Sequence, residues 1–155
     1  MKNTGFLQSL SHAAAGFWAA IKRERNLRFH LTVTNLLCVF AYHYGLGRTE
    51  WAALVLTITL VIGAELMNTA VEKAVDTATR QRRLDAKHAK DIAAAAVLTT
   101  AAGAVVIGLL LFGEPERLIK TLEKIFTTPG ILVPVLFLVC LDLCFLFLPA
   151  WIKKR

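Results

Sequence analysis

Five polar side chains follow one another along a single stretch of this 155-residue chain. At about 100° per residue they fall on one narrow face of a helix, and they are Glu65, Asn68, Thr69, Glu72 and Asp76. Residues 51–63, directly before them, are almost entirely apolar, which places the start of this helix in hydrocarbon. Because ionisable groups are costly at membrane depth, this polar stripe is a candidate functional site.

The spacing of the two glutamates suits two neighbouring tasks. Glu65 and Glu72 are two helical turns apart, about 10 Å along the axis, so they cannot easily share one proton or one ion. The deeper Glu65 could act as a general base, Glu72 could bind Mg²⁺, and Asn68 between them could orient either group. Phosphoryl transfer needs these parts together with cations that hold a nucleotide.

Three interpretations remain open from these residues alone. The stripe could serve an enzyme, a proton or ion pathway in a small transporter, or a polar contact between helices. The sequence contains no GxxxxGK[ST] phosphate loop, HExxH metal motif, paired-cysteine metal motif or GxSxG nucleophile motif. Any chemistry therefore depends on carboxylates and cations near one face of the membrane.

The composition predicts an all-α integral membrane protein. Hydrophobic residues make up 56% of the chain and charged residues only 19%. The apolar residues form four blocks near the length that spans a bilayer: 31–46, 51–75, 89–112 and 131–151. The first block is the shortest and least apolar. We expect a helical bundle with three spans and a probable fourth.

The distribution of basic residues predicts the orientation. Thirteen Lys and Arg residues lie in the segments on one side of the four blocks and four on the other. The positive-inside rule therefore predicts that both termini and the loop at 80–90 are cytoplasmic. The net charge of +7 is explained by orientation and anionic lipid, and we expect no nucleic-acid partner.

Two further helices are expected at the membrane surfaces. Residues 6–25 have an apolar side and a basic end, which predicts an amphipathic helix on the inner surface. Residues 113–129 have helical amphipathicity with Pro115 near the start, which predicts a short external helix. The last block carries Asp142 near its middle, and that carboxylate would need a partner such as Thr99 or His30, or else tolerate the membrane at a cost.

The residues 65–76, followed by Ala89-Lys90-Asp91 and the apolar run to Val97, resemble the prokaryotic diacylglycerol kinase family of small membrane-embedded lipid kinases. The resemblance extends back to Gly16 and Glu24 and covers roughly residues 5–112. It implies a homotrimer in the bacterial cell membrane, with active sites shared between protomers. ATP would enter from the cytoplasm and the lipid from the bilayer.

The resemblance also implies roles for individual residues. Glu65 matches the catalytic base, Asn68 its supporting residue, and Glu24 and Glu72 the acids that hold the magnesium bound to ATP. The positions expected to contact the nucleotide are Lys90, Asp91, Gln81, Arg82, Arg83 and His12, the last where Tyr or Phe is usual.

Residues 24–30 contain a Glu-Arg-Asn-x-Arg-x-His pattern that is similar to the Gram-positive undecaprenol kinase branch of this family. This favours undecaprenol as the acceptor, with diacylglycerol as the alternative. The family is usually complete after its third span. We therefore expect a kinase domain at 1–113 and a C-terminal extension at 114–155.

Overall fold

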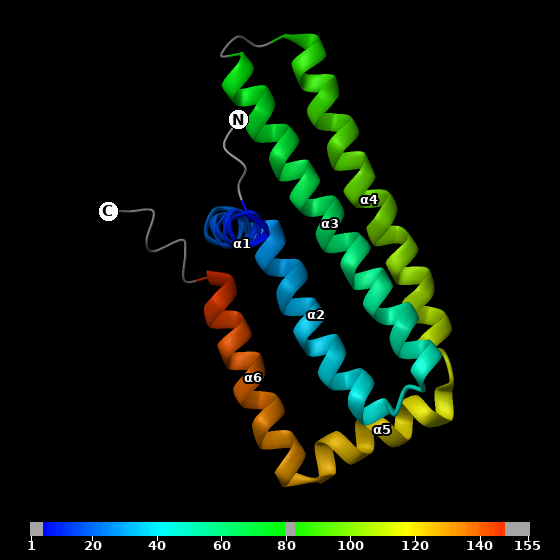
Figure 1. Cartoon of the computed structure of the whole chain (residues 1–155). Helices are drawn as coiled ribbons and strands as arrows, with labels where there is room; N and C mark the ends of the chain where they lie inside the picture. The colour runs from blue at the N-terminus through cyan, green and yellow to red at the C-terminus, as the bar shows by residue number, and fades with distance from the viewer. Residues whose placement is uncertain (1–4, 80–82, 148–155) are drawn as a thin grey trace.

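The computed structural model describes residues 5–79 and 83–147, and within these ranges it consists of helices without β-strands (Figure 1). The helices are α1 (Phe6–Arg23), α2 (Arg25–Tyr44), α3 (Arg48–Ala78), α4 (Leu84–Phe112), α5 (Pro115–Thr127) and α6 (Pro129–Phe147). Helices α2, α3, α4 and α6 run lengthwise beside one another, α1 crosses at the start of α2, and α5 crosses the opposite end of α2, while α3 and α4 extend beyond α1 (Figure 1). The predicted all-α class is confirmed.

Three of the four predicted spans are confirmed as helices that are long and apolar enough to cross a membrane. Among the described residues these are α3 and α4, which contain the second and third apolar blocks, and α6, which covers the fourth block up to residue 147. Helix α2, which covers the first block up to residue 44, has 20 residues but does not reach the same apolarity. Its polar side chains are the reason, and they include Thr32, Thr34, Asn35 and His43.

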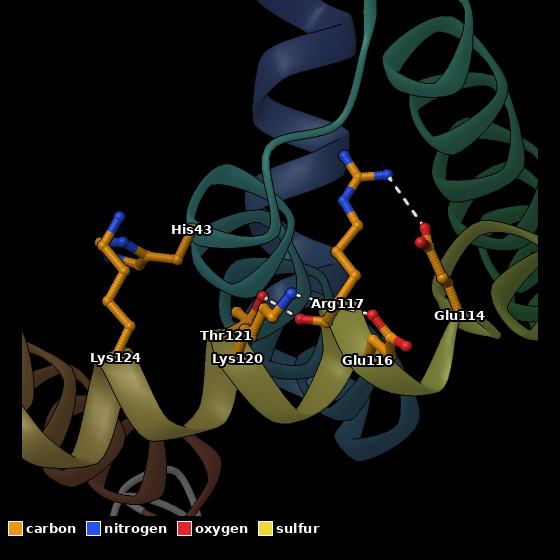
Figure 2. A pocket seen from close by; sticks show the side chains of 7 residues that line it. All are labelled: His43, Glu114, Glu116, Arg117, Lys120, Thr121 and Lys124. Atoms are coloured by element: carbon orange, nitrogen blue, oxygen red, sulfur yellow. Dashed lines mark hydrogen bonds and ion pairs between the residues drawn. The ribbon is translucent and has the colours of Figure 1, made fainter.

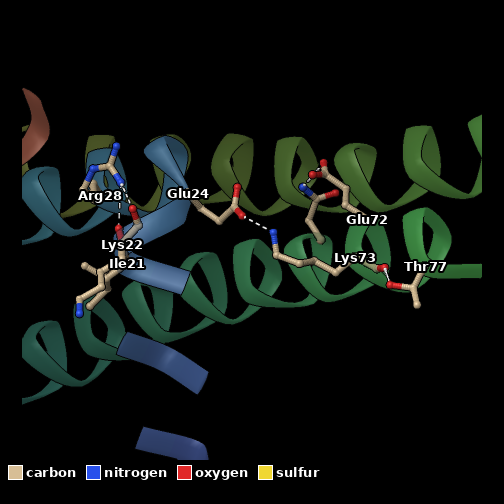
Figure 3. Close-up of polar contacts among 8 residues, drawn as sticks. Ile21, Lys22, Glu24, Arg28, Glu72, Lys73 and Thr77 are labelled. Carbon is tan, nitrogen blue, oxygen red and sulfur yellow. Dashed lines mark hydrogen bonds and ion pairs between the residues drawn. The ribbon is translucent and has the colours of Figure 1, made fainter. Parts of the chain in front are cut away.

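The end of the bundle near α1 is shaped by a polar corner between α1 and α2. The backbone is extended at Glu24, and the Glu24 N–H donates to the Ala20 carbonyl oxygen at 2.8 Å. The Arg28 guanidinium donates to the Ile21 carbonyl oxygen at 2.9 Å, which satisfies an otherwise free carbonyl at the end of α1 (Figure 3). We call this end of the bundle the inner end.

The opposite end, called the outer end below, holds the main apolar core. Helix α2 ends at Gly45, whose φ of +80° is favourable only for glycine among common residues. Four buried residues form the core cluster there: Ala41, Tyr44, Leu46 and Leu54. The Tyr44 ring contacts the rings of Phe40 and Phe112, with centroids 5.9 and 5.1 Å apart.

Helix α5 confirms the predicted short amphipathic helix and closes the outer end. Pro115 occupies its first turn, where a missing N–H costs nothing. A pocket of about 320 Å³ lies between α5 and the end of α2 (Figure 2). Its lining mixes cationic side chains with Glu114 and Glu116, so it has no single strong charge.

Helix α6 corrects the predicted partners of Asp142. The Asn35 Nδ2 atom of α2 donates to both carboxylate oxygens of Asp142 at 3.1 Å, and neither Thr99 nor His30 is the partner. The position of Asp142 along the chain gives its depth but not its direction around the helix. The direction is set by how α6 packs on α2.

Candidate active site

Glu65 is the most deeply buried acid of the polar stripe. Its residue is 3% exposed, and Asn68 and Thr69 beside it on α3 are also buried. The side chain of Asn26 interacts with the Glu65 carboxylate, and His30 lies close enough for electrostatic interaction. Asn26 and His30 are one turn apart on α2, so the first turns of α2 face the buried carboxylate. The Glu65 carboxylate therefore faces the polar side chains of Asn26 and His30.

Asn68 connects the stripe to Glu72. Its Nδ2 atom donates to Glu72 Oε1 at 3.0 Å. Its Oδ1 atom is buried and has no hydrogen-bond partner among the described residues. Because a buried acceptor without a partner is costly, this oxygen is available to a ligand, a water molecule or a metal ion.

Glu24 reaches the same end of α3 from the corner between α1 and α2. Lys73 Nζ lies 2.8 Å from Glu24 Oε1, in an ion pair that spans α2 and α3 (Figure 3). Lys73 directly follows Glu72, and electrostatic interactions also connect Glu65 with both Glu24 and Glu72. The three predicted acids therefore lie in one region, with Lys73 among them.

The residues fit a partial magnesium site. No group of three or more His, Cys, Asp and Glu side chains in the described ranges is close enough to hold a metal ion alone. Mg²⁺ normally binds one or two carboxylates and completes its six ligands with phosphate oxygens and water. Glu24, Glu72 and the unpaired Asn68 oxygen provide hard oxygen ligands of this kind.

The predicted nucleotide-binding residues are only partly brought together. Lys90 on α4 forms an ion pair with Asp76 on α3, while Asp91 is exposed beside it. Arg83 is the N-cap residue of α4 and His12 is exposed on α1, and within the described ranges neither forms a hydrogen bond or ion pair with the three glutamates. Gln81 and Arg82 lie outside the described residues.

An apolar cavity of about 240 Å³ adjoins this region between α2, α3 and α4. His30, Thr34 and Thr57 supply its few polar groups, and α4 contributes the small residues Ala101, Ala104 and Gly108. His30 both lines the cavity and interacts with Glu65. The cavity can therefore accept an apolar chain whose polar end lies near the buried carboxylate.

The sequence did not predict three members of this site, which are Lys73, Asn26 and His30. Lys73, as the partner of Glu24, could have been suspected from its place beside Glu72, because consecutive helical residues diverge by about 100° and can reach different neighbours. The contact of Asn26 with Glu65 depends on how α2 packs against α3. No spacing within either helix could have predicted that contact.

A helical membrane bundle that places a buried carboxylate near an apolar cavity has the features of an enzyme acting on lipid. The comparisons with known proteins specify the class further. The family model described as prokaryotic diacylglycerol kinase matches residues 11–112. The chain belongs to this family and is a lipid kinase, so the transporter and purely structural interpretations are set aside.

Three named relatives are similar to the chain. It is 37% identical over 107 residues to the undecaprenol kinase of Bacillus subtilis, across 69% of this chain and 87% of that protein. It is 39% identical over 110 residues to a diacylglycerol kinase of Synechocystis, across 70% of this chain and 63% of that protein. A diacylglycerol kinase of Pseudomonas aeruginosa is 31% identical over 90 residues, across 58% and 73% of the two chains. No solved structure gives a significant match.

Proposed function

We propose that the chain transfers the terminal phosphate of ATP to the hydroxyl of undecaprenol, forming undecaprenyl phosphate. The similarity to the undecaprenol kinase of Bacillus subtilis supports this acceptor, as does the pattern of residues 24–30. The observation that carries the chemistry is the burial of Glu65 beside Asn26, His30 and an apolar cavity.

Glu65 is the proposed general base. It would accept the proton of the lipid hydroxyl as the oxygen attacks the terminal phosphorus of ATP and the bond from that phosphorus to ADP breaks. The polar groups of Asn26 and His30 would orient the carboxylate. The apolar cavity would hold the part of the lipid chain next to its hydroxyl. Placing the chain there restricts the hydroxyl to the neighbourhood of Glu65, which supplies the positioning that phosphoryl transfer requires.

Glu24 and Glu72 are the proposed ligands for the magnesium of ATP, and Asn68 is the proposed supporting residue between Glu72 and the base Glu65. The Glu24 and Glu72 carboxylates would hold Mg²⁺ beside the nucleotide, and the ion would supply positive charge that offsets the charge of the phosphate oxygens. Glu72 is already oriented by its hydrogen bond from Asn68, whereas Glu24 would exchange its ion pair with Lys73 for the metal. Lys73 would then be free to attract a phosphate oxygen.

We propose that Lys90, Asp91 and Arg83 contact the nucleotide, together with Gln81, Arg82 and His12. The position of Lys90 and Asp91 at the end of α4 beyond the apolar part of the helix supports this assignment. Lys90 would release Asp76 to bind a phosphate. Binding of the nucleotide would thus replace the ion pairs Lys90–Asp76 and Lys73–Glu24, which form when no nucleotide is bound.

We further propose a homotrimer in the bacterial cell membrane with both termini and the active site in the cytoplasm. The excess of basic residues on one side supports the orientation. Helix α4 buries none of its residues within the described chain although it has many small side chains, which supports close contact with another protomer. The family match ends at residue 112, which supports a kinase domain at 1–113 and an extension at 114–155.

The test is phosphate transfer from labelled ATP in detergent micelles that contain either undecaprenol or diacylglycerol. Glu65→Gln serves as the blank, and the magnesium concentration is kept the same. Faster labelling of undecaprenol supports the proposed acceptor, whereas faster labelling of diacylglycerol would replace it with the acceptor named for two of the relatives. Labelling of neither lipid above the blank, by folded protein, would contradict the proposal.

A further inference from the structure

Helices α5 and α6 follow the residues that match the family and are attached to α2 at two separate places. The family match ends at residue 112, and α5 begins at Pro115. In Figure 1, α5 crosses the outer end and α6 returns alongside α2 toward α1. The extension therefore contacts the helix whose first turns carry Asn26 and His30.

The first attachment lies near the middle of α2. Asp142 is 8% exposed within α6, the most apolar of the three candidate spans. Both of its carboxylate oxygens accept from Asn35 Nδ2, which is itself on an exposed part of α2. A buried carboxylate in such a helix is costly without a partner, so this contact fixes α6 against α2 at one position and direction.

The second attachment is at the outer end of α2. Arg117 Nε donates to the Tyr44 carbonyl oxygen at 3.0 Å, and Arg117 Nη2 donates to the Gly45 carbonyl oxygen at 2.5 Å. The guanidinium also lies over the Tyr44 ring, 4.3 Å from its centre. Arg117 therefore occupies carbonyl groups that the end of an α-helix otherwise leaves free.

One contact at the inner end of α2 involves a proposed ligand of the metal. There Glu24, the N-cap residue of α2, forms an ion pair with Lys73 of α3, and the Lys73 side chain is half exposed. Under the proposed function Glu24 gives up Lys73 when it binds the magnesium of ATP. The contacts with α5 and α6 do not involve any proposed ligand, so they persist while the site is occupied.

We propose that α5 and α6 form an intramolecular brace for α2 and that Asn35 and Asp142 are positioning residues of the kinase. The brace holds the α2 face that carries Asn26 and His30 against Glu65. Its catalytic consequence rests on the proposed function, whereas its effect on α2 can be measured without any enzymatic activity.

The experiment uses three full-length variants in detergent micelles. Asp142→Leu removes the contact, the double variant Asn35→Asp/Asp142→Asn restores a carboxylate–amide pair with the partners exchanged, and Leu143→Ala changes the neighbouring exposed residue as a control. Amide hydrogen exchange of residues 26–32 reports the stability of the inner half of α2. Transfer kinetics with the preferred lipid report the positioning of Glu65's neighbours.

We expect Asp142→Leu to accelerate exchange of residues 26–32 by about 3- to 20-fold, the range that one hydrogen bond between membrane helices provides. The kcat for transfer should fall by a similar factor while the KM for ATP stays unchanged. The exchanged pair should return both quantities to within about twofold of the original chain, and Leu143→Ala should change neither.

If the rate of amide hydrogen exchange is unchanged in Asp142→Leu, the brace is overturned. It is also overturned if that rate rises and the double variant Asn35→Asp/Asp142→Asn does not restore it. Faster exchange with an unchanged kcat would overturn the role of Asn35 and Asp142 as positioning residues. If the original chain phosphorylates neither lipid, the proposed function fails, but the exchange measurements still decide whether the brace exists.

Discussion

The two ends of the α2–α3 pair are built from opposite kinds of contact. At the outer end, Tyr44 and Leu54 are buried in an apolar core that Arg117 covers. At the inner end, the buried side chains are Glu65, Asn68 and Thr69, and the contacts around them are polar. The outer end is arranged for stability, whereas the inner end keeps polar groups that a ligand can recruit.

Because the two ends differ in this way, substitutions that affect activity and substitutions that affect stability should lie at different ends. Packing of apolar and aromatic side chains stabilises the outer end through van der Waals contacts, which drive helix association where the surrounding lipid is itself apolar. Burial of Glu65 and of the unpaired Asn68 oxygen costs free energy and persists because the rest of the bundle supports it. Substitutions at the inner end should change activity more than stability, and substitutions at the outer end should do the reverse.

Glu65→Gln should give the largest effect on activity. The amide keeps the shape of the carboxylate but cannot accept a proton from the acceptor hydroxyl, so kcat should fall by about 10²- to 10⁴-fold. Thermal unfolding in detergent should occur at or above the original temperature, because a buried charge has been removed. Glu123→Gln on the exposed surface of α5 is the matched control. Retained activity in Glu65→Gln would contradict the assignment of the base.

Glu24→Gln and Glu72→Gln should have a smaller effect that depends on magnesium. Each removes one negatively charged oxygen ligand, and the Mg²⁺ concentration for half-maximal rate should rise by about tenfold. A high Mg²⁺ concentration should restore much of the rate in these variants but not in Glu65→Gln. A titration of transfer rate against Mg²⁺ measures this difference. Equal losses in all three variants that magnesium cannot correct would argue against separate roles.

At the inner end, the sequence predicted which residues share a face of one helix, but it did not predict the contacts between helices. The period of 3.6 residues sufficed to place Glu65, Asn68 and Glu72 on one face, because all three belong to one helix. It could not predict the pairing of Lys73 with Glu24 or the hydrogen bond of Asn35 to Asp142. Those contacts join distant segments, so they depend on how whole helices pack and rotate against each other.

The elements at the outer end were predicted with their approximate limits, but its core was not. Pro115 marked the start of the short external helix because its backbone preference is local. The position of Arg117 over Tyr44 brings together residues 73 positions apart. Local preferences contain no information about such a contact.

Arg117→Met should destabilise the outer end while leaving the kinetics of the folded protein nearly unchanged. The substitution removes two charge-assisted hydrogen bonds to carbonyl oxygens, and the free energy of unfolding should fall by about 1.5–3 kcal/mol. Lys120→Met on the same helix is the control, because Lys120 is 77% exposed and its pair with Glu116 is weak. Thermal unfolding measures the loss of stability. A large fall in kcat with little change in the unfolding temperature would contradict the idea that the outer end serves stability and the inner end serves activity.

Tyr44→Phe should give the smallest effect and tests the apolar character of the outer core. The Tyr44 hydroxyl is buried and has no hydrogen-bond partner among the described residues, so it contributes a cost and no contact. Phe keeps the ring contacts with Phe40 and Phe112, and the free energy of unfolding should stay unchanged or rise by up to about 1 kcal/mol. Tyr44→Leu, which removes the ring, should lower it. A loss of stability in Tyr44→Phe comparable to that in Tyr44→Leu would mean that the hydroxyl has a partner, and the outer end would then rely on buried polar contacts as the inner end does.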